Sequence, residues 1–177
     1  MMTTRSLTIR PATQADAATV WRIIEGEKQI MRDAGRDQWQ NEYPNPESIA
    51  ADVAAGVGRV LLAGGVIVGY CALIATGESH YDHIEGMWLT AGDSSHCNYA
   101  VVHRIAIAPQ LTGQGLATSF MQLLLDEAAA MGLESMRIDT NHDNVQMLHL
   151  LPKLGFNYCG IVEVADGPRR AYEKLLR

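Results

Sequence analysis

Residues 99–125 read YAVVHRIAIAPQLTGQGLATSFMQLLL, and the rest of the chain is best understood from them. The run Val101 to Ile107 is rich in β-branched residues and stops before Pro109, which predicts a buried β-strand. From Leu116 onward, apolar residues recur every three or four positions, which predicts an amphipathic helix. A turn containing two glycines, residues 112–115, separates the two elements. We therefore expect a strand, a glycine turn and a helix in immediate succession.

The start of such a helix is suited to hold a phosphate. Its first amides have no partner within the helix and carry the positive end of the helix dipole. Gly113 and Gly115 would let the backbone come close to the ligand. Neither common nucleotide motif fits: a P-loop needs Lys and Ser or Thr where Leu116 and Ala117 stand, and GxGxxG needs a small residue at Thr118. An ordinary connection between a strand and a helix is the alternative.

This turn resembles the cofactor turn of the GNAT superfamily, the acyl-CoA-dependent N-acyltransferases. The family pattern is [Q/R]-x-x-G-x-[G/A], and residues 112–117, TGQGLA, occupy it with Thr112 in place of Gln or Arg. A second register that begins at Gln110 matches every specified letter, but the count from Pro109 favours the first. The resemblance implies that the pyrophosphate of acetyl-CoA contacts Thr112, Gly113, Gln114, Gly115, Leu116 and Ala117, and that its pantetheine arm contacts the backbone of Ile105, Ala106 and Ile107.

Composition and charge set the outer bounds. With 177 residues, 47% hydrophobic and 19% charged, residues 1–177 are expected to form a single domain with a sizeable core. A formal charge of -6 argues against nucleic acid as the main partner and mildly favours cationic substrates such as amines. No apolar run approaches the ~20 residues of a membrane span, and the start MMTTRS lacks the apolar core of a signal peptide. We expect a cytoplasmic protein with no membrane partner, and the oligomeric state stays open, a homodimer included.

Cysteine and histidine spacing does not favour a metal site. Cys71, Cys97 and Cys159 are far apart and form no CxxC pair, so reduced thiols in or near the core are expected. The polar stretch 76–98 holds three histidines and several carboxylates but matches no metal-ligand motif. No metal ion is therefore expected.

The remaining segments predict the other elements of a mixed α/β fold. Gly64-Gly65 between two apolar runs indicates a hairpin turn. We expect a central twisted mixed sheet of six or seven strands flanked by about four helices, as the resemblance also implies. Strands are expected at 7–10, 60–63, 66–74, 136–140, 156–164 and 170–176, which with 101–107 make seven, and 85–89 looks like a further short strand. Further helices are expected at 13–31, 46–55 and 145–154.

The resemblance extends over nearly the whole chain. Behind the strand at 136–140 the family carries N-x-x-A-x-x-L-Y-x-K-x-G-F, which implies that Asn144 lies near the cofactor. Met147 replaces the Ala of this pattern and Leu151 replaces the Tyr. Because that tyrosine commonly returns a proton to the leaving thiolate, its role cannot be carried over to this chain. The residues that match are Asn144, Leu150, Lys153, Gly155 and Phe156.

The loop between the first two helices is a candidate acceptor site. It carries Trp39 and Tyr43 and is bounded by Pro44 and Pro46. Aromatic residues on a loop often cover the core, and this is one interpretation. The resemblance implies the other, in which Trp39 and Tyr43 bind the substrate.

His103 is the first candidate for the general base. An ordinary histidine pKa near ~6.5 suits proton removal near neutrality. On a regular strand His103 shares one face with Val101, Ile105 and Ile107. A purely structural histidine is the alternative.

Other groups are weaker candidates for the chemistry. Glu85 is a second base candidate because its strand is expected to pair with that of His103. Tyr99, Tyr158 and water are candidates for the acid. The resemblance implies direct transfer of acetyl from acetyl-CoA to a primary amine in a ternary complex, most simply that of a small molecule. A protein or peptide amine, an acyl-CoA-binding module without turnover and a nucleotide-binding regulatory domain are the alternatives.

Overall fold

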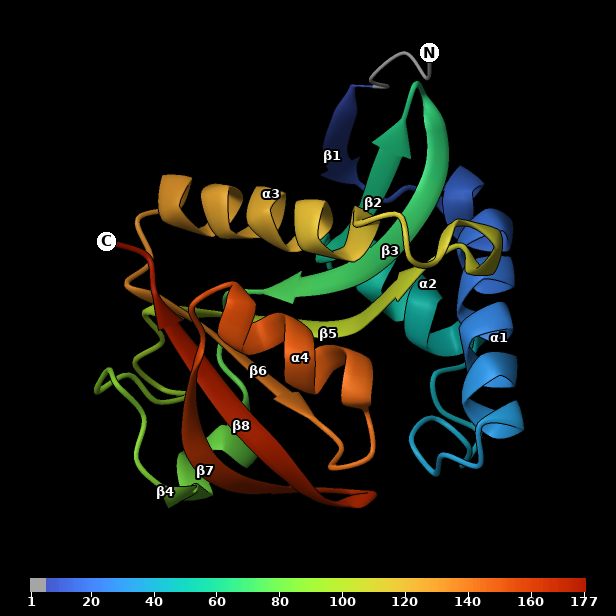
Figure 1. Cartoon of the computed structure of the whole chain (residues 1–177). Coiled ribbons are helices and arrows are strands. Elements are labelled where there is room, and N and C mark those ends of the chain that lie inside the picture. Colours follow the sequence, from blue (N-terminus) through green and yellow to red (C-terminus); the bar gives the residue numbers. More distant parts are fainter. Residues whose placement is uncertain (1–5) are drawn as a thin grey trace. The chain divides into compact units, whose positions relative to one another are not determined.

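The computed structural model describes residues 6–177, which form eight strands and four α-helices (Figure 1). All eight strands belong to one mixed sheet in the order β1-β2-β3-β5-β6-β8-β7-β4. The strands are β1 (Leu7–Pro11), β2 (Gly58–Ala63), β3 (Val66–Ile74), β4 (Glu85–Gly86), β5 (Tyr99–Ile107), β6 (Ser135–Thr140), β7 (Asn157–Val164) and β8 (Gly167–Leu175). The helices are α1 (Ala17–Asp33), α2 (Pro46–Ala54), α3 (Leu116–Ala130) and α4 (Val145–Lys153), with short 3-10 turns at Gln14–Asp16, Ser79–His83 and Pro109–Leu111.

The expected mixed α/β class is confirmed, whereas the expected count of six or seven strands is too low. The segment 85–89 forms a strand only at Glu85–Gly86. The short strand expected there is present but three residues shorter than predicted.

The chain divides into two compact units. The first consists of the chain up to Leu73 together with His103–Leu124, and the second consists of Ile74–Val102 together with Leu125–Arg177. Strand β5 therefore gives its first half to the second unit and its second half to the first.

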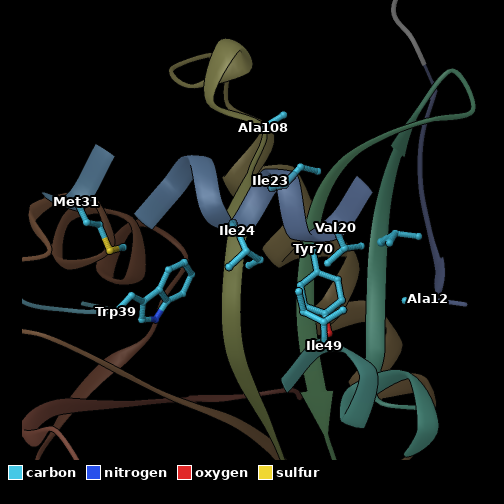
Figure 2. Packing of buried hydrophobic residues seen from close by; sticks show 11 residues of the cluster. Ala12, Val20, Ile23, Ile24, Met31, Trp39, Ile49, Tyr70 and Ala108 are labelled. Atoms are coloured by element: carbon cyan, nitrogen blue, oxygen red, sulfur yellow. The ribbon is translucent and has the colours of Figure 1, made fainter. Parts of the chain in front are cut away.

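The first unit has its core between α1, α2 and the sheet (Figure 2). The buried stripe of α1, with Val20 and Ile24 fully buried, packs with Ile49 of α2 and with Tyr70 of β3. Ala106 of β5 belongs to the same cluster. Burying such aliphatic side chains contributes about 1.5–3 kcal/mol each, so this cluster holds the two helices on the sheet.

A hairpin and an ion pair fix the start of this unit. Gly64 and Gly65 both have positive φ, 60° and 84°, and form the predicted two-residue turn between β2 and β3. Before α1, the Asp16 carboxylate accepts hydrogen bonds from the Thr13 amide at 2.8 Å and from Arg10 at 2.7 and 3.0 Å. Helix α1 begins at Ala17, a short turn later than expected.

The second unit is built on β6, β7 and β8. Strand β6 pairs in parallel with the first residues of β5, Tyr99 opposite Ser135, and antiparallel with β8. Strands β7 and β8 form the predicted closing hairpin, and β4 adds to β7 at the edge. In this second unit, the fully buried Arg137 donates a hydrogen bond from its Nε to Glu173 at 3.1 Å. The guanidinium carbon of Arg137 also lies over the ring of Tyr99, 3.8 Å from the ring centroid.

Among residues 6–177, no helix combines the length and the apolar character needed to cross a membrane.

Candidate functional site

The predicted glycine turn lies where the sequence places it, at the start of α3 (Figure 1). Strand β5 ends at Ile107, a 3-10 turn covers Pro109–Leu111, and α3 begins at Leu116. Gly113 and Gly115 have φ of 82° and 77°, in the left-handed region that favours glycine. The interpretation of this segment as a turn that opens a helix is therefore confirmed.

The turn fits an anionic ligand. Residues 112–115 are exposed, and a Cβ placed on either glycine would meet no atom within 4 Å. The first amides of α3 lack partners within the helix and carry its positive dipole end. The first turn of α3 contains no acidic residue that would repel a phosphate. Backbone and space thus suit the pyrophosphate of a coenzyme A molecule.

Strand β5 does not keep the expected alternation past His103. Arg104 has φ of 57°, so the strand contains a left-handed residue directly after the candidate base. Regular alternation requires extended backbone at every residue, so Ile105 and Ile107 do not continue the face of Val101 and His103. The expectation of one face for all four residues is wrong for this reason. His103 itself is half-buried.

Arg104 is the centre of a polar cluster that the sequence did not reveal. Its Nε and Nη2 donate to both carboxylate oxygens of Asp52 on α2, at 2.9 and 2.5 Å. The Tyr70 hydroxyl of β3 also donates to Asp52, at 2.6 Å. Nη1 of Arg104 donates to the hydroxyl of Tyr43. The feature of the sequence that could have indicated this cluster is Asp52, a carboxylate three residues after the buried Ile49 on a short helix.

Burial acts on the protonation of Tyr70 within this cluster. Burial, followed by the hydrogen bond to Asp52, raises the pKa of Tyr70 far above its usual value. The phenol therefore keeps its proton and serves as a donor. Asp52 thus receives a hydrogen bond from a neutral phenol in addition to those from a guanidinium.

The structure separates the two loop aromatics that were expected to bind substrate. Trp39 is only 7% exposed and lies in the core cluster, where its ring points toward Met31 of α1 (Figure 2). The alternative, an aromatic that covers the core, describes Trp39. Tyr43 is 39% exposed, and its ring lies 5.7 Å from the Arg104 guanidinium carbon. Tyr43 remains available to line an acceptor site.

Glu85 is not on a strand next to β5, and that expectation is wrong. Its strand β4 pairs with β7, Glu85 opposite Ile161, and three strands separate β4 from β5 in the sheet. Glu85 is exposed at the edge. The argument for Glu85 as a base rested on the pairing and loses its support.

Tyr99 is fully buried in a cluster of the second unit with Tyr81 and Val162. Its hydroxyl accepts a hydrogen bond from the Glu78 amide at 3.3 Å. Burial raises the pKa of Tyr99, and this hydrogen bond offsets only part of the effect. Such surroundings describe a structural tyrosine better than an acid that exchanges protons with a substrate.

Helix α4 carries the other residues of the family pattern. Asn144 is buried and caps the helix, accepting a hydrogen bond from the Met147 amide at 3.3 Å. Leu151, which stands where the family has tyrosine, is fully buried. No hydroxyl is thus present at that position of α4. Among residues 6–177, no group of three or more His, Cys, Asp or Glu side chains is arranged to hold a metal ion.

Comparison with known proteins decides the family. The profile of the Acetyltransferase (GNAT) family matches residues 23–156. The chain belongs to the GNAT acetyltransferase family. Among solved structures, it is similar to a GNAT-family acetyltransferase from Streptococcus agalactiae 2603, with 36% identity over 99% of this chain and 98% of that one and a TM-score of 0.87. No curated protein matches the chain significantly.

More distant GNAT structures share the fold. A GNAT-family acetyltransferase from Listeria monocytogenes 4b F2365 is 17% identical over 96% of this chain and 94% of that one, with a TM-score of 0.74. The aminoglycoside acetyltransferase AAC(6')-Ib, solved in complex with coenzyme A and kanamycin, is 18% identical over 96% of this chain and 95% of that one, with a TM-score of 0.70. At these identities the likeness shows the fold alone.

Proposed function

We propose that the protein transfers an acetyl group from acetyl-CoA to a primary amine of a small molecule, by direct attack in a ternary complex. The observation that carries the proposal is the open glycine turn at the start of α3, in a chain of the GNAT family. The family match at 23–156 includes parts of both compact units, which supports treating residues 1–177 as one acetyltransferase domain.

We assign the cofactor contacts to backbone groups, as the family resemblance implies. The amides of Thr112 to Ala117 bind the pyrophosphate, and the backbone of Ile105 to Ile107 binds the pantetheine arm. When bound, acetyl-CoA supplies the thioester whose carbonyl carbon accepts the amine. Thr112 offers a hydroxyl rather than a cationic side chain, so the amides and the helix dipole carry this contact.

His103 acts as the general base. The amine must lose a proton to attack, and a half-buried imidazole on β5 is a group of the right chemistry for this. No acidic residue stands at Val101 to share the role. Because Leu151 replaces the usual tyrosine, we assign the return of a proton to the thiolate to water.

A small cationic amine is the favoured acceptor. The chain is acidic overall, with a formal charge of -6, which favours cationic ligands. One structure with the same fold, AAC(6')-Ib, holds kanamycin together with coenzyme A. Aminoglycosides are therefore included among the small cationic amines to be tested as acceptors.

Two measurements test the proposal. Acetyl-CoA should raise the melting temperature of the protein, while ATP and NAD at equal concentration should leave it unchanged. A panel of small amines, aminoglycosides and peptides should then be screened for release of the CoA thiol. Stabilisation by acetyl-CoA with no thiol release from any amine would favour the alternative that Leu151 suggests, an acyl-CoA-binding module without turnover.

A further inference from the structure

The Arg104 side chain lies directly after the candidate base and binds two other elements of the first unit, with a third reached through Asp52. Its partners are Asp52 on α2, through two hydrogen bonds, and Tyr43 in the loop between α1 and α2. Asp52 in turn accepts a hydrogen bond from Tyr70 on β3. One guanidinium thus joins β5 to a helix, a loop and a neighbouring strand.

The backbone of Arg104 is strained. A φ of 57° is uncommon for a residue with a long side chain, and such a conformation costs on the order of 1 kcal/mol. Strained residues persist only where their surroundings determine the backbone, and they gather at functional sites. The contacts of the guanidinium are the surroundings that hold this one.

The ion pair is well suited to fix a geometry. The side chains of Arg104 and Asp52 are only 11% and 7% exposed. A planar guanidinium that donates two parallel hydrogen bonds to one carboxylate has a single favourable orientation. Lysine carries the same charge but cannot reproduce that orientation.

We propose that Arg104 is a positioning residue for acetyl transfer, which holds the left-handed turn of β5 beside His103 and fixes Tyr43 as a wall of the acceptor site. This inference rests on the proposed function. It adds that the acceptor loop is held by the strand that carries the base, so that acceptor binding and base alignment depend on the same side chain. Tyr43 therefore contributes to the choice of acceptor.

Four variants separate the parts of this role. Arg104→Gly removes the guanidinium, and glycine adopts the left-handed backbone conformation without strain. Arg104→Ala removes the same group but leaves a strained residue at that position. Arg104→Lys keeps the charge without the paired hydrogen bonds. Tyr43→Phe removes only the contact to the loop. Arg10→Lys is the matched control, since Arg10 makes a similar double contact to Asp16 in the same unit, on β1.

The measurements are kcat, the KM for an amine accepted by the wild type, and the Kd for acetyl-CoA. We expect Arg104→Gly and Arg104→Ala to lower kcat about 10- to 100-fold and to raise the acceptor KM, with Arg104→Lys between them and the wild type. Tyr43→Phe should raise the acceptor KM with little change in kcat. Acetyl-CoA affinity should stay within about twofold in Tyr43→Phe, which leaves the backbone groups that hold the cofactor unchanged.

The acceptor KM distinguishes positioning from loss of structure. A smaller fraction of folded molecules lowers the apparent kcat but leaves KM unchanged. Arg10→Lys should change neither constant. Wild-type KM and kcat in Arg104→Lys and Tyr43→Phe would overturn the inference, even if Arg104→Gly failed to fold. A wild-type protein that releases no CoA with any amine would instead overturn the proposed function.

Discussion

At the scale of single residues, burial decides which polar groups have a role in structure and which are left for chemistry. His103 is half-buried, whereas Tyr99 is fully buried beneath Arg137. A group that must exchange a proton with a substrate needs access, so His103 remains a candidate for the base while Tyr99 loses support as the acid.

Replacing His103 tests its assignment as the base. His103→Ala should lower turnover by about 10²- to 10⁴-fold at neutral pH while acetyl-CoA affinity barely changes. A higher pH should partly restore the rate, because more of the amine is then already neutral. His96→Ala, which removes a strongly exposed histidine, is the control. Full turnover with an unchanged pH profile in His103→Ala would make His103 structural.

Glu27 offers a test of burial without catalysis. It lies on the core-facing stripe of α1, between Ile24 and Met31, and burial raises the pKa of its carboxyl despite the opposing charge of Arg36. The folded state thus favours the protonated acid. The contribution of Glu27 to stability is full below its unfolded pKa, about 4.3, and is lost as the pH rises through its higher folded pKa.

We therefore expect Glu27→Gln to raise the melting temperature by a few degrees at pH 7, and to lose this advantage near pH 4. Thermal unfolding at the two pH values measures the effect. Glu25→Gln, at an exposed position of the same helix, should change little. A lower melting temperature of Glu27→Gln at pH 7 would mean that the ionised carboxylate is stabilised in the folded state.

Residue-level prediction from the sequence failed where partners are distant along the chain. Residue type alone could not show that Trp39 belongs to the core or that Arg104 joins Asp52. Their positions depend on tertiary packing. The positive φ of Arg104 had no signal at all, because neither glycine nor asparagine marks it.

At the scale of elements, the turn before α3 was predictable because its signals are local. A β-branched run, a proline and two glycines lie within 15 residues of Val101, and each has a physical meaning of its own. Strand β4 is the opposite case, since its pairing with β7 joins residues far apart in sequence. The incorrect placement of Glu85 followed from this difference.

Gly115 tests the turn as the pyrophosphate site. Any residue with a Cβ is strained at φ of 77°, so Gly115→Ala measures the strain and Gly115→Glu adds a negative charge in the same place. Titration calorimetry should show a modest loss of acetyl-CoA affinity for the alanine variant and loss of binding for the glutamate variant. Equal affinities in both variants would place the pyrophosphate elsewhere.

At the scale of the whole molecule, the fold class followed from the sequence because the order of elements and a family resemblance agreed. The composition of an ordinary globular domain and the alternation of strands and helices both indicated a mixed sheet. The order of the strands in the sheet could not be predicted in this way. It depends on which strands pair at long range, for example β6 with β8, and no local pattern encodes it.

Removal of one partner from the buried ion pair of Arg137 and Glu173 should strongly destabilise the second unit. Burial alone would raise the pKa of Glu173, but hydrogen bonds from Ser135 and Thr90 and the charge of Arg137 outweigh burial and lower it. The stability that this carboxylate contributes is therefore complete above its unfolded pKa of about 4.3 and lost as the pH falls through its lower folded pKa.

Arg137→Met should destabilise the protein by about 3–5 kcal/mol, because it leaves Glu173 charged and buried without its cationic partner. Urea unfolding at pH 7 measures the change. Arg177→Met is a matched control, since Arg177 approaches Glu134 at 3.6 Å with a largely exposed side chain. A loss below about 1 kcal/mol for Arg137→Met would show that the pair is not a main support of the fold.

Initial rates of CoA release, with acetyl-CoA and an accepted amine varied together, test direct acetyl transfer in a ternary complex. We predict that thiol release requires the amine and that double-reciprocal plots give intersecting lines, as expected when both substrates must be bound. Parallel lines would indicate an acyl-enzyme and contradict direct transfer. An absence of amine-dependent thiol release across the panel would contradict the proposed activity itself.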